Sequence, residues 1–338
     1  MSHLQMPEIF FAGVSFVFGS VVGSFLNVCI YRIPRGESIV YPASRCPKCS
    51  HSIQWYDNIP IISWFILRGK CRHCGESISW QYPLVESLTA VLFLLIFLRF
   101  RFVWATPIYM AFTAALILVA FVDFAEWIIP DEVTLPGIPL ALICALLATW
   151  HPDSGLRVLG ATNPVFDAII GIEAGGVLFL LDKLARLMLN KPGMGGGDIK
   201  LLAMIGGLLG WGGAFLTVFV AAVFGSLIGL IVLLLTKKQE EENAEASPSS
   251  TKKIGFGDWY GMPGTILITA TFSFLAMFGR KKTEPDSSKN EDDEDAHEIT
   301  LAGHYLPFGP YLCLGALVVM FYGKEIVDFY LSALDVGL

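Results

Sequence analysis

The sequence predicts an all-α polytopic membrane protein with about eight transmembrane helices. Hydrophobic residues make up 54% of the 338 residues, charged residues make up only 16%, and the mean hydropathy is +0.61. A soluble domain has a charged fraction near one quarter. Apolar runs that approach the roughly 20 residues of a membrane helix recur along the chain. They are Ile9–Val28, 82–98, Val103–Val122, a run ending near Trp150, Val165–Leu181, Ile199–Trp211, Phe215–Leu235 and 306–322.

The first run is expected to be a retained span. It has neither a basic stretch before it nor a small-residue cleavage site after it, which a secretory signal would show. It ends in Gly23-Ser24-Phe25-Leu26-Asn27-Val28. Small residues permit close contact with a second helix, and we expect Asn27 to need a hydrogen-bond partner at this depth.

The polar stretch 29–83 fixes the expected orientation. It carries seven Lys and Arg residues against three Asp and Glu residues, and short loops rich in positive charge stay in the cytoplasm. The same rule places the N-terminus outside. Arg99 and Arg101, beyond the second span, are the local exception on the outer side.

Four cysteines in this stretch predict a metal site. Cys46 and Cys49 form one C-x-x-C pair, and Cys71 and Cys74 form a second pair after 21 further residues. Two such pairs can present four thiolates to one zinc ion, as in a zinc ribbon. A reducing cytoplasm disfavours disulfides, and four protein ligands leave no open position, so we expect a structural zinc. The remaining cysteines, Cys29, Cys144 and Cys313, are expected to be buried thiols.

Carboxylates stand at the expected cytoplasmic ends of the second and third spans. Glu86 opens the second span, where it suits an interfacial position or the helix dipole. Asp123 follows about 20 largely apolar residues and is either an interfacial terminus or a functional group. Asp131 follows Pro130, and we expect it to cap the next helix.

A glycine run places another carboxylate at the start of an apolar helix. The stretch Gly193-Met194-Gly195-Gly196-Gly197-Asp198 precedes the span that begins at Ile199. Glycines let the backbone take unusual conformations and approach another chain closely. An ionisable group at this depth is costly, which makes Asp198 a functional candidate.

A cytoplasmic insert is expected at 237–305. Its polar stretches 239–251 and 283–298 have the composition of disordered segments. The apolar stretch 262–278 has basic residues on both sides, so we expect a cytoplasmic β element or interfacial segment rather than a further span. A second G-x-G-D in the insert ends at Asp258, which is expected to be a turn residue.

The last span begins after Leu306-Pro307-Phe308-Gly309-Pro310. This break is expected to fix a non-helical entry to the membrane. The span should end near Tyr322, with a polar tail from Gly323.

Asp123 and Asp198 are 75 positions apart but are expected at the same membrane depth. Two neighbouring carboxylates cannot both ionise easily, so they share a proton and can act as base and acid of a protease. The alternative is a transporter that relays protons through buried carboxylates, although a relay needs carboxylates at several depths. Nothing in the sequence suggests a nucleic-acid partner, because it has no basic patch.

The chain closely resembles the type IV prepilin peptidases, membrane aspartic proteases of the GxGD type. The resemblance covers nearly everything outside 237–304. It rests on the motif at 23–28, the four cysteines, Tyr82-Pro83-Leu84-Val85-Glu86, the run from Asp123 to Pro130-Asp131, Gly195-Gly196-Gly197-Asp198-Ile199-Lys200-Leu201-Leu202-Ala203 and Pro307-Phe308-Gly309-Pro310-Tyr311-Leu312. The insert is the departure from the family pattern.

This resemblance implies an enzyme with two activities. It implies that Asp123 and Asp198 cleave the leader of type IV prepilins and type II secretion pseudopilins at the cytoplasmic face of the bacterial inner membrane. It also implies N-methylation of the new N-terminus with S-adenosylmethionine, although the sequence has no Rossmann-like glycine fingerprint for this cofactor. The alternative within the class is a GxGD protease without methyltransferase activity that acts on other membrane substrates.

These inferences divide the chain into five parts. They are a first transmembrane helix at 1–28, a cytoplasmic zinc-binding module with four cysteine ligands at 29–83, a transmembrane catalytic core at 84–236, a partly disordered insert at 237–305, and a last transmembrane helix with a tail at 306–338. The expected partners are the prepilin substrates and membrane lipid.

Overall fold

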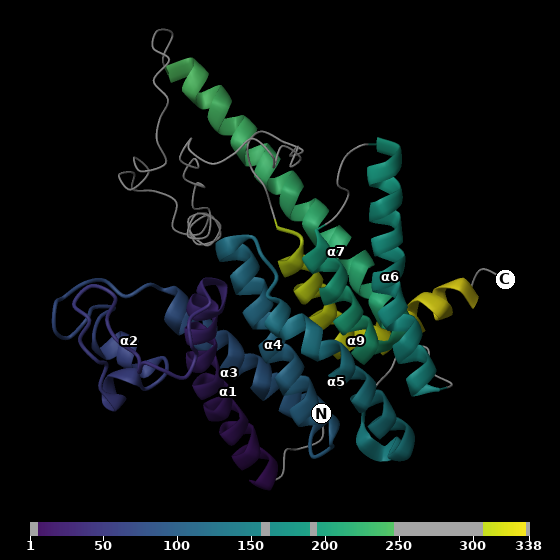
Figure 1. Cartoon of the computed structure of the whole chain (residues 1–338), viewed down its shortest axis with the longest axis horizontal. Coiled ribbons are helices and arrows are strands. Elements are labelled where there is room, and N and C mark those ends of the chain that lie inside the picture. Colours follow the sequence, from purple (N-terminus) through teal and green to yellow (C-terminus); the bar gives the residue numbers. More distant parts are fainter. Residues whose placement is uncertain (1–5, 157–162, 190–194, 247–306, 336–338) are drawn as a thin grey trace. The chain divides into compact units, whose positions relative to one another are not determined.

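The computed structural model describes residues 6–156, 163–189, 195–246 and 307–335. Apart from the mostly non-helical stretch 36–80, these residues form helices with short connections (Figure 1). The described residues contain isolated β-bridges but no strand. The α-helices are α1 (Met6–Arg32), α2 (Ile62–Ile66), α3 (Gln81–Phe100), α4 (Ala105–Glu126), α5 (Asp131–Trp150), α6 (Pro164–Leu189), α7 (Gly196–Ala246) and α9 (Gly309–Asp335). Short 3₁₀ helices occupy Ile33–Arg35 (η1), Trp55–Asn58 (η2) and Pro152–Ser154 (η3).

Six of the described helices are long and apolar enough to cross a membrane: α1, α3, α4, α5, α6 and α7. The prediction of a helical, multi-pass membrane protein is therefore confirmed. Helix α7 contains a break at Gly210, where φ is 79° and ψ is 175°. The break separates two helical arms and lies next to the turn that the sequence predicts between the sixth and seventh spans.

Helices α1 and α3 approach each other closely, as the small residues of α1 predicted. A Cβ added at Gly19 would lie 2.8 Å from Cα of Ala90, and one at Gly23 would lie 2.7 Å from Cα of Glu86. Only glycine therefore allows this backbone separation. Near the end of α1, Asn27 donates from Nδ2 to the carbonyl oxygen of Tyr82 at 3.1 Å, which is the partner its burial requires.

The first arm of α7 is the most enclosed helix of the membrane bundle. All ten residues from Leu201 to Gly210 are buried. Gly206 packs against the backbone of Gly171 on α6, and a Cβ added at Gly207 would lie 2.9 Å from Cβ of Ala141 on α5. The glycines of this arm therefore allow α5 and α6 to pack closely around it. The helix that carries Asp198 is for this reason also a central helix of the bundle.

The predicted polar tail from Gly323 is wrong, because α9 continues to Asp335. Apolar residues recur after Gly323 and sustain the helix. Glu325 in this stretch forms an ion pair with Arg99, and Arg101 pairs with Glu8 of α1 at 3.1 Å. The two arginines that violated the charge rule therefore have acidic partners at the same end of the bundle.

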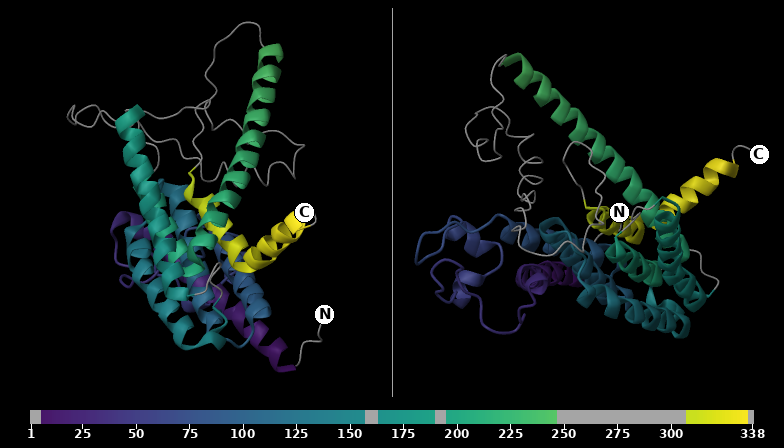
Figure 2. Two further views of the ribbon diagram at one scale, coloured as in Figure 1. Left: turned by 90° about the vertical axis from the view of Figure 1, so that its right-hand side faces the viewer. Right: turned by 45° about the horizontal axis from the view of Figure 1, so that its top comes forward.

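The chain separates into two compact units, Met1–Ala221 with Pro307–Leu338, and Ala222–Leu306. The first unit contains Asp123, Asp198, the four clustered cysteines and α2; Figure 2 gives two further views of the chain. Of the second unit, the structure describes only the helical segment 222–246. The expected disorder of 239–251 is wrong for its first part, because residues 239–246 continue helix α7. The predictions for 247–251, Asp258, the stretch 262–278 and the segment 283–298 lie outside the described residues.

Candidate functional site

Asp123 lies in the last turn of α4 and is only 6% exposed. The helix ends three residues later, where Trp127 adopts a left-handed conformation and its N–H donates to the carbonyl oxygen of Asp123 at 3.0 Å. A left-handed residue at this position is a common helix stop. It turns the chain toward Pro130 and leaves the carboxylate at the end of the buried helix.

Asp198 is the third residue of α7 and follows directly on the glycine run. A Cβ added at Gly197 would lie 2.8 Å from Cβ of Ile129, in the loop between α4 and α5. A Cβ at Gly195 would lie 3.2 Å from the Asp198 carboxylate. The glycines thus let the start of α7 contact the α4–α5 loop, and they leave the approach to Asp198 uncrowded.

The structure brings Asp123 and Asp198 together. Their carboxylates interact electrostatically with each other, and the backbone N–H of Gly309 donates to the Asp123 carboxylate. Gly309 also packs on Ile129. Cys313, one turn further along α9, is buried and within electrostatic range of both aspartates. Three segments distant in sequence, the ends of α4, α7 and α9, therefore meet around two carboxylates.

Three contributions to this arrangement escaped the sequence interpretation: the packing role of Ile129, the N–H of Gly309, and the proximity of Cys313. The only signal for any of them was the Pro-Phe-Gly-Pro break, which predicted a fixed entry to the last helix. The identity of its contact depends on packing between segments that are far apart along the chain.

The predicted capping role of Asp131 is wrong. Asp131 is the first residue of α5, Pro130 occupies the N-cap, and no side chain caps the helix. Both carboxylate oxygens of Asp131 instead accept from Nζ of Lys200 at 2.8 Å. Lys200 lies two residues after Asp198, so this ion pair connects the start of α5 with the helix that carries Asp198.

We expect Lys200→Met to lower cleavage of the substrate by about two- to fivefold. The two side chains are 39% and 51% exposed, and exposed ion pairs contribute roughly 0.2–1 kcal/mol. The measurement is kcat and KM with purified protein. Reversal of the pair, Lys200→Asp with Asp131→Lys, should recover part of the loss, and Lys48→Gln, in a pair far from the aspartates, should leave the rate unchanged. A reversed pair that performs no better than Lys200→Met alone would contradict a positioning role.

Two further contacts tie the segment after α1 to the bundle. Arg35 pairs with Glu126, one turn beyond Asp123, at 2.8 Å. Glu86 is 7% exposed and accepts the backbone N–H of Ile61 at 2.6 Å. Glu86 therefore lies inside the protein and accepts a hydrogen bond from a specific backbone donor. The predicted interfacial position or helix-dipole interaction does not describe this contact fully.

The four predicted cysteine ligands form one cluster. The Sγ atoms of Cys46, Cys49, Cys71 and Cys74 all lie within 4.8 Å of one another, and those of Cys46 and Cys74 lie 3.8 Å apart. Zinc–sulfur bonds of about 2.3 Å in a tetrahedron place neighbouring sulfurs at about 3.8 Å. The backbone N–H of Cys49 donates to Cys46 and lowers the pKa of its thiol, whereas burial and hydrogen bonds with the other three thiols raise the pKa of Cys74, so the distances and not the thiol pKa values carry the assignment. The cluster therefore fits a closed zinc site.

The cluster is built from two equivalent knuckles offset by 25 residues. The N–H of Cys46 bonds the carbonyl of His51 and that of Cys71 bonds the carbonyl of Glu76, and the bridges Arg45–Ser52 and Lys70–Ser77 follow the same offset. The residue after each second cysteine has a positive φ, 56° at Ser50 and 72° at Gly75. The repeated geometry explains how two distant C-x-x-C pairs present matched thiols.

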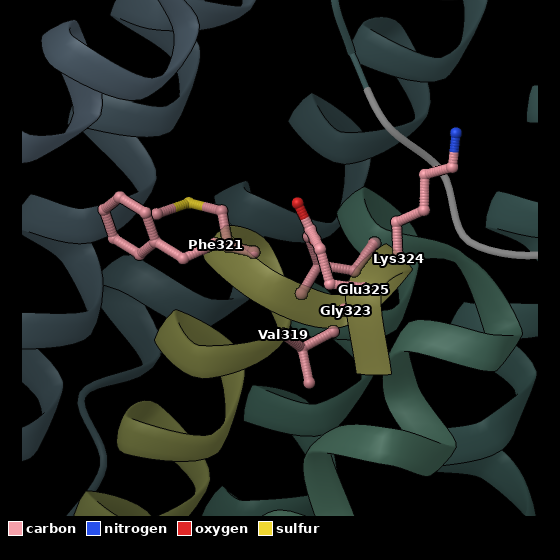
Figure 3. Close-up of a pocket in the computed structure, with 7 residues that line it drawn as sticks. Val319, Phe321, Gly323, Lys324 and Glu325 are labelled. Atoms are coloured by element: carbon pink, nitrogen blue, oxygen red, sulfur yellow. The ribbon is translucent and has the colours of Figure 1, made fainter. Parts of the chain in front are cut away.

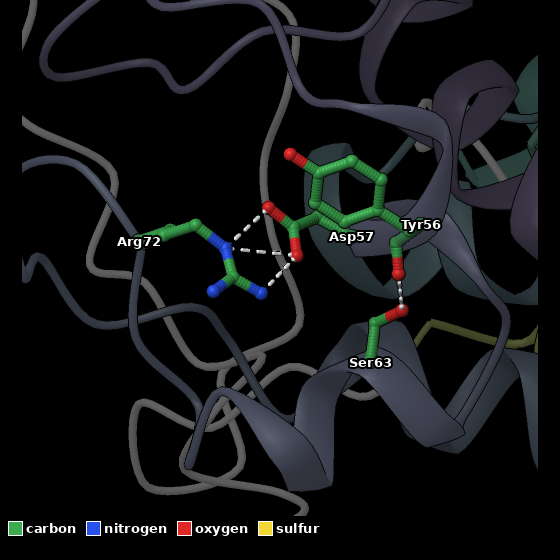
Figure 4. A network of polar contacts seen from close by, with 4 residues as sticks. All are labelled: Tyr56, Asp57, Ser63 and Arg72. Atoms are coloured by element: carbon green, nitrogen blue, oxygen red, sulfur yellow. Dashed lines mark hydrogen bonds and ion pairs between the residues drawn. The ribbon is translucent and has the colours of Figure 1, made fainter.

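A charged contact fixes η2 to the second knuckle. Arg72 donates to both carboxylate oxygens of Asp57, with the shortest contact at 2.6 Å, and holds the pKa of that carboxyl below its usual range (Figure 4). The same figure shows the hydroxyl of Ser63, on α2, donating to the carbonyl of Tyr56. The module is thus held together by polar contacts as well as by its cysteines.

We expect Cys46→Ser to lose bound zinc and to destabilise residues 40–80, because three thiolates and a hydroxyl bind zinc poorly. Metal content per protein and limited proteolysis of this segment measure the two effects. Cys144→Ser, which changes a buried thiol outside the cluster, is the control and should keep its zinc. An unchanged zinc content in Cys46→Ser would remove that residue from the site.

A pocket in the described part of the protein lies away from Asp123 and Asp198 (Figure 3). It is lined by Leu209 and by α9 residues Val319, Met320, Phe321, Gly323, Lys324 and Glu325. The α9 residues lie at least ten positions beyond Gly309, or about 15 Å along the helix. The pocket therefore takes no part in the arrangement around Asp123 and Asp198.

Comparisons with known proteins identify the chain's relatives. A family model described as the bacterial peptidase A24 N-terminal domain matches residues 17–100, and one described as the type IV leader peptidase family matches residues 110–230. No solved structure matches the chain.

Two curated relatives illustrate the similarity. A prepilin leader peptidase/N-methyltransferase of Myxococcus xanthus (strain DK1622) is 33% identical over 330 residues, which cover 96% of this chain and 94% of the relative. A protein of the same name from Neisseria gonorrhoeae is 37% identical over 262 residues, which cover 70% of this chain and 87% of the relative. With matches that span both halves of its membrane core, the chain belongs to the type IV leader peptidase family.

Proposed function

We propose that this protein cleaves the leader peptides of type IV prepilins and type II secretion pseudopilins and then methylates the new N-terminus. The observation that carries the peptidase proposal is the meeting of Asp123 and Asp198 beside the glycine run. Family membership and the names of the relatives support the substrate class and the methylation step.

In the proposed reaction the two carboxylates share one proton. The ionised carboxylate takes a proton from water as the oxygen attacks the scissile carbonyl, and the protonated carboxyl gives its proton to the carbonyl oxygen. Proton transfer to the leaving nitrogen then releases the amine as the C–N bond breaks. The N–H of Gly309 holds the Asp123 carboxylate in place, and Gly195, where an added Cβ would lie 3.2 Å from the Asp198 carboxylate, leaves space for an extended substrate backbone.

The methylation step acts on the amine that cleavage produces. S-adenosylmethionine would supply the methyl group and would leave as S-adenosylhomocysteine. The names of the curated relatives carry this part of the proposal, and no residue of the chain is assigned to the cofactor.

The zinc that we propose at Cys46, Cys49, Cys71 and Cys74 is structural. Four protein ligands complete a tetrahedral ion and leave no position for a substrate or water. The metal would hold the two knuckles together and would take no direct part in cleavage.

We further propose eight membrane spans. The two arms of α7 and the helix α9 supply the spans beyond α1, α3, α4, α5 and α6. The charge distribution of 29–83 supports a position of this stretch, and of the ends of α4 and α7, at the cytoplasmic face of the bacterial inner membrane. The five-part division at residues 28, 83, 236 and 305 is part of the same proposal.

The test uses a purified prepilin, the wild-type protein in detergent and S-adenosylmethionine with a labelled methyl group. Release of the leader with transfer of label to the mature N-terminus is the expected result. Cleavage without label would favour the alternative, a GxGD protease without methyltransferase activity. Absence of cleavage by a zinc-loaded protein would contradict the proposed substrate class.

A further inference from the structure

Helix α2 has its polar side inside and its apolar side outside. Ser63 is 7% exposed and its hydroxyl donates to the carbonyl of Tyr56 at 3.2 Å, whereas Ile62, Phe65 and Ile66 are 55%, 59% and 70% exposed. Phe65 and Ile66 lie three and four residues beyond Ile62, which is one helical turn, so the three apolar residues form a single stripe. A helix on a water-facing surface buries such a stripe and exposes its polar residues.

The position of α2 is fixed against a membrane helix. The backbone N–H of Ile61, directly before α2, donates to the buried carboxylate of Glu86 at 2.6 Å. Glu86 is five residues beyond Gln81, where α3 begins, and each helical residue advances about 1.5 Å. The start of α2 therefore lies beside the second turn of α3, at the depth where a spanning helix passes from headgroups to hydrocarbon.

Exposed apolar residues also lie on α3 and directly before it. Trp80, which precedes α3, is 57% exposed and contacts Trp64 of α2 with ring centroids 4.2 Å apart. Further along α3, Leu88, Val91 and Leu95 are exposed at helical spacing. Tryptophan is enriched where a membrane meets water, because the indole has an apolar body and a polar N–H. By helical spacing Trp64 lies on the side of α2 opposite the stripe, so the contact with Trp80 holds α2 beside the start of α3 and leaves the stripe uncovered.

Positive charge flanks the stripe. Arg68 and Lys70 follow α2 and are exposed. The nearby Asp57 carboxylate is already neutralised by Arg72. Basic residues next to an apolar surface attract anionic lipid headgroups.

We propose that α2, together with Trp80, lies in the lipid–water interface beside the N-terminal end of α3. The partner that covers the exposed stripe is an anionic lipid leaflet. The stripe Ile62, Phe65 and Ile66 enters the headgroup–acyl boundary, and Arg68 and Lys70 contact the headgroups. The cysteine module is then held on one side by the Glu86 contact and on the other by lipid. This assignment is independent of the substrate and of the catalytic residues.

The test is photocrosslinking from single positions in the full-length protein, reconstituted in vesicles of phosphatidylglycerol and phosphatidylcholine that carry an alkyne-tagged lipid. p-Benzoylphenylalanine replaces Ile66, or Val91 of α3 as a lipid-exposed reference, or Lys48 on the first knuckle as a matched exposed control. Zinc content shows that each variant retains the folded module.

We expect lipid labelling at position 66 to be comparable with position 91 and about tenfold above position 48, because an interfacial helix inserts its apolar face into the acyl boundary. Labelling at position 66 should fall when phosphatidylglycerol is omitted. Labelling no higher than at position 48 would overturn the proposal. A protein–protein adduct at position 66 in place of lipid would assign the stripe to a second copy instead.

Discussion

Asp198→Asn is expected to lower prepilin cleavage by about 10²–10⁴-fold, the range that a positioned acid–base group contributes. The amide keeps the shape of the side chain but removes the proton that the two carboxylates share. Asp123→Asn should have an effect of the same order, and the double variant should be little worse than either single one, because residues that act as a unit are not additive. The measurement is single-turnover cleavage of purified prepilin in detergent.

Two controls distinguish loss of chemistry from loss of structure. Zinc content and the thermal unfolding midpoint of each variant should match those of the wild type, because Asp198 is partly exposed and amide replaces carboxylate without a change of volume. Asp258→Ala, which removes the carboxylate of the second G-x-G-D, should leave cleavage unchanged. An inactive Asp258→Ala or an active Asp198→Asn would show that the catalytic carboxylate was assigned to the wrong motif.

Gly309→Ala is expected to lower cleavage by about 10²-fold, although the change adds only one methyl group. A Cβ at this position would overlap Oδ2 of Asp123 and lie 3.2 Å from Cδ1 of Ile129. The Asp123 carboxylate must therefore move away from the Gly309 N–H that positions it. This movement also changes its position relative to Asp198. Misplacement of a catalytic group by about 1 Å costs rate on this scale. The expected change is in kcat, measured under saturating prepilin.

The matched control for this variant is Gly196→Ala. Gly196 begins α7 two residues before Asp198, and a Cβ added there would have no neighbour within 4 Å. We expect its cleavage rate to stay within about twofold of the wild type, because alanine is a better helix former than glycine and meets no obstacle. Equal losses of cleavage rate in Gly309→Ala and Gly196→Ala would indicate that added methyl groups disturb the whole region. Such a result would contradict a specific effect of Gly309 on Asp123.

The residues of the candidate dyad could be selected from the sequence because each has a local signature. Asp123 ends a long apolar run, and Asp198 follows a dense glycine run and opens another apolar helix. Their catalytic role stays a prediction, whereas the helical, multi-pass fold and the clustering of the four cysteines are confirmed. Cysteine spacing was informative because two C-x-x-C pairs can close one tetrahedron whatever fold surrounds them.

The wrong predictions for Asp131 and for the tail after Gly323 have a shared physical cause. Asp131 has the residue type and position of a helix cap, but Lys200, 69 positions away, offers a charged partner. Gly323 and the charges after it resemble the start of a tail, but Arg99 pairs with Glu325 and the helix continues. In both cases the prediction rested on neighbouring residues, whereas the observed partner is distant in sequence.

The sequence by itself determined the membrane class, the order of the spans and the residue types available for chemistry, because hydropathy and spacing are properties of neighbouring residues. Only the tertiary structure decided which groups meet. It placed the N–H of Gly309 on Asp123, Ile129 between two glycines, and Glu86 on Ile61. Each of these contacts joins segments that hydropathy cannot relate, since a span's sequence specifies its depth in the membrane but leaves its neighbours to helix packing.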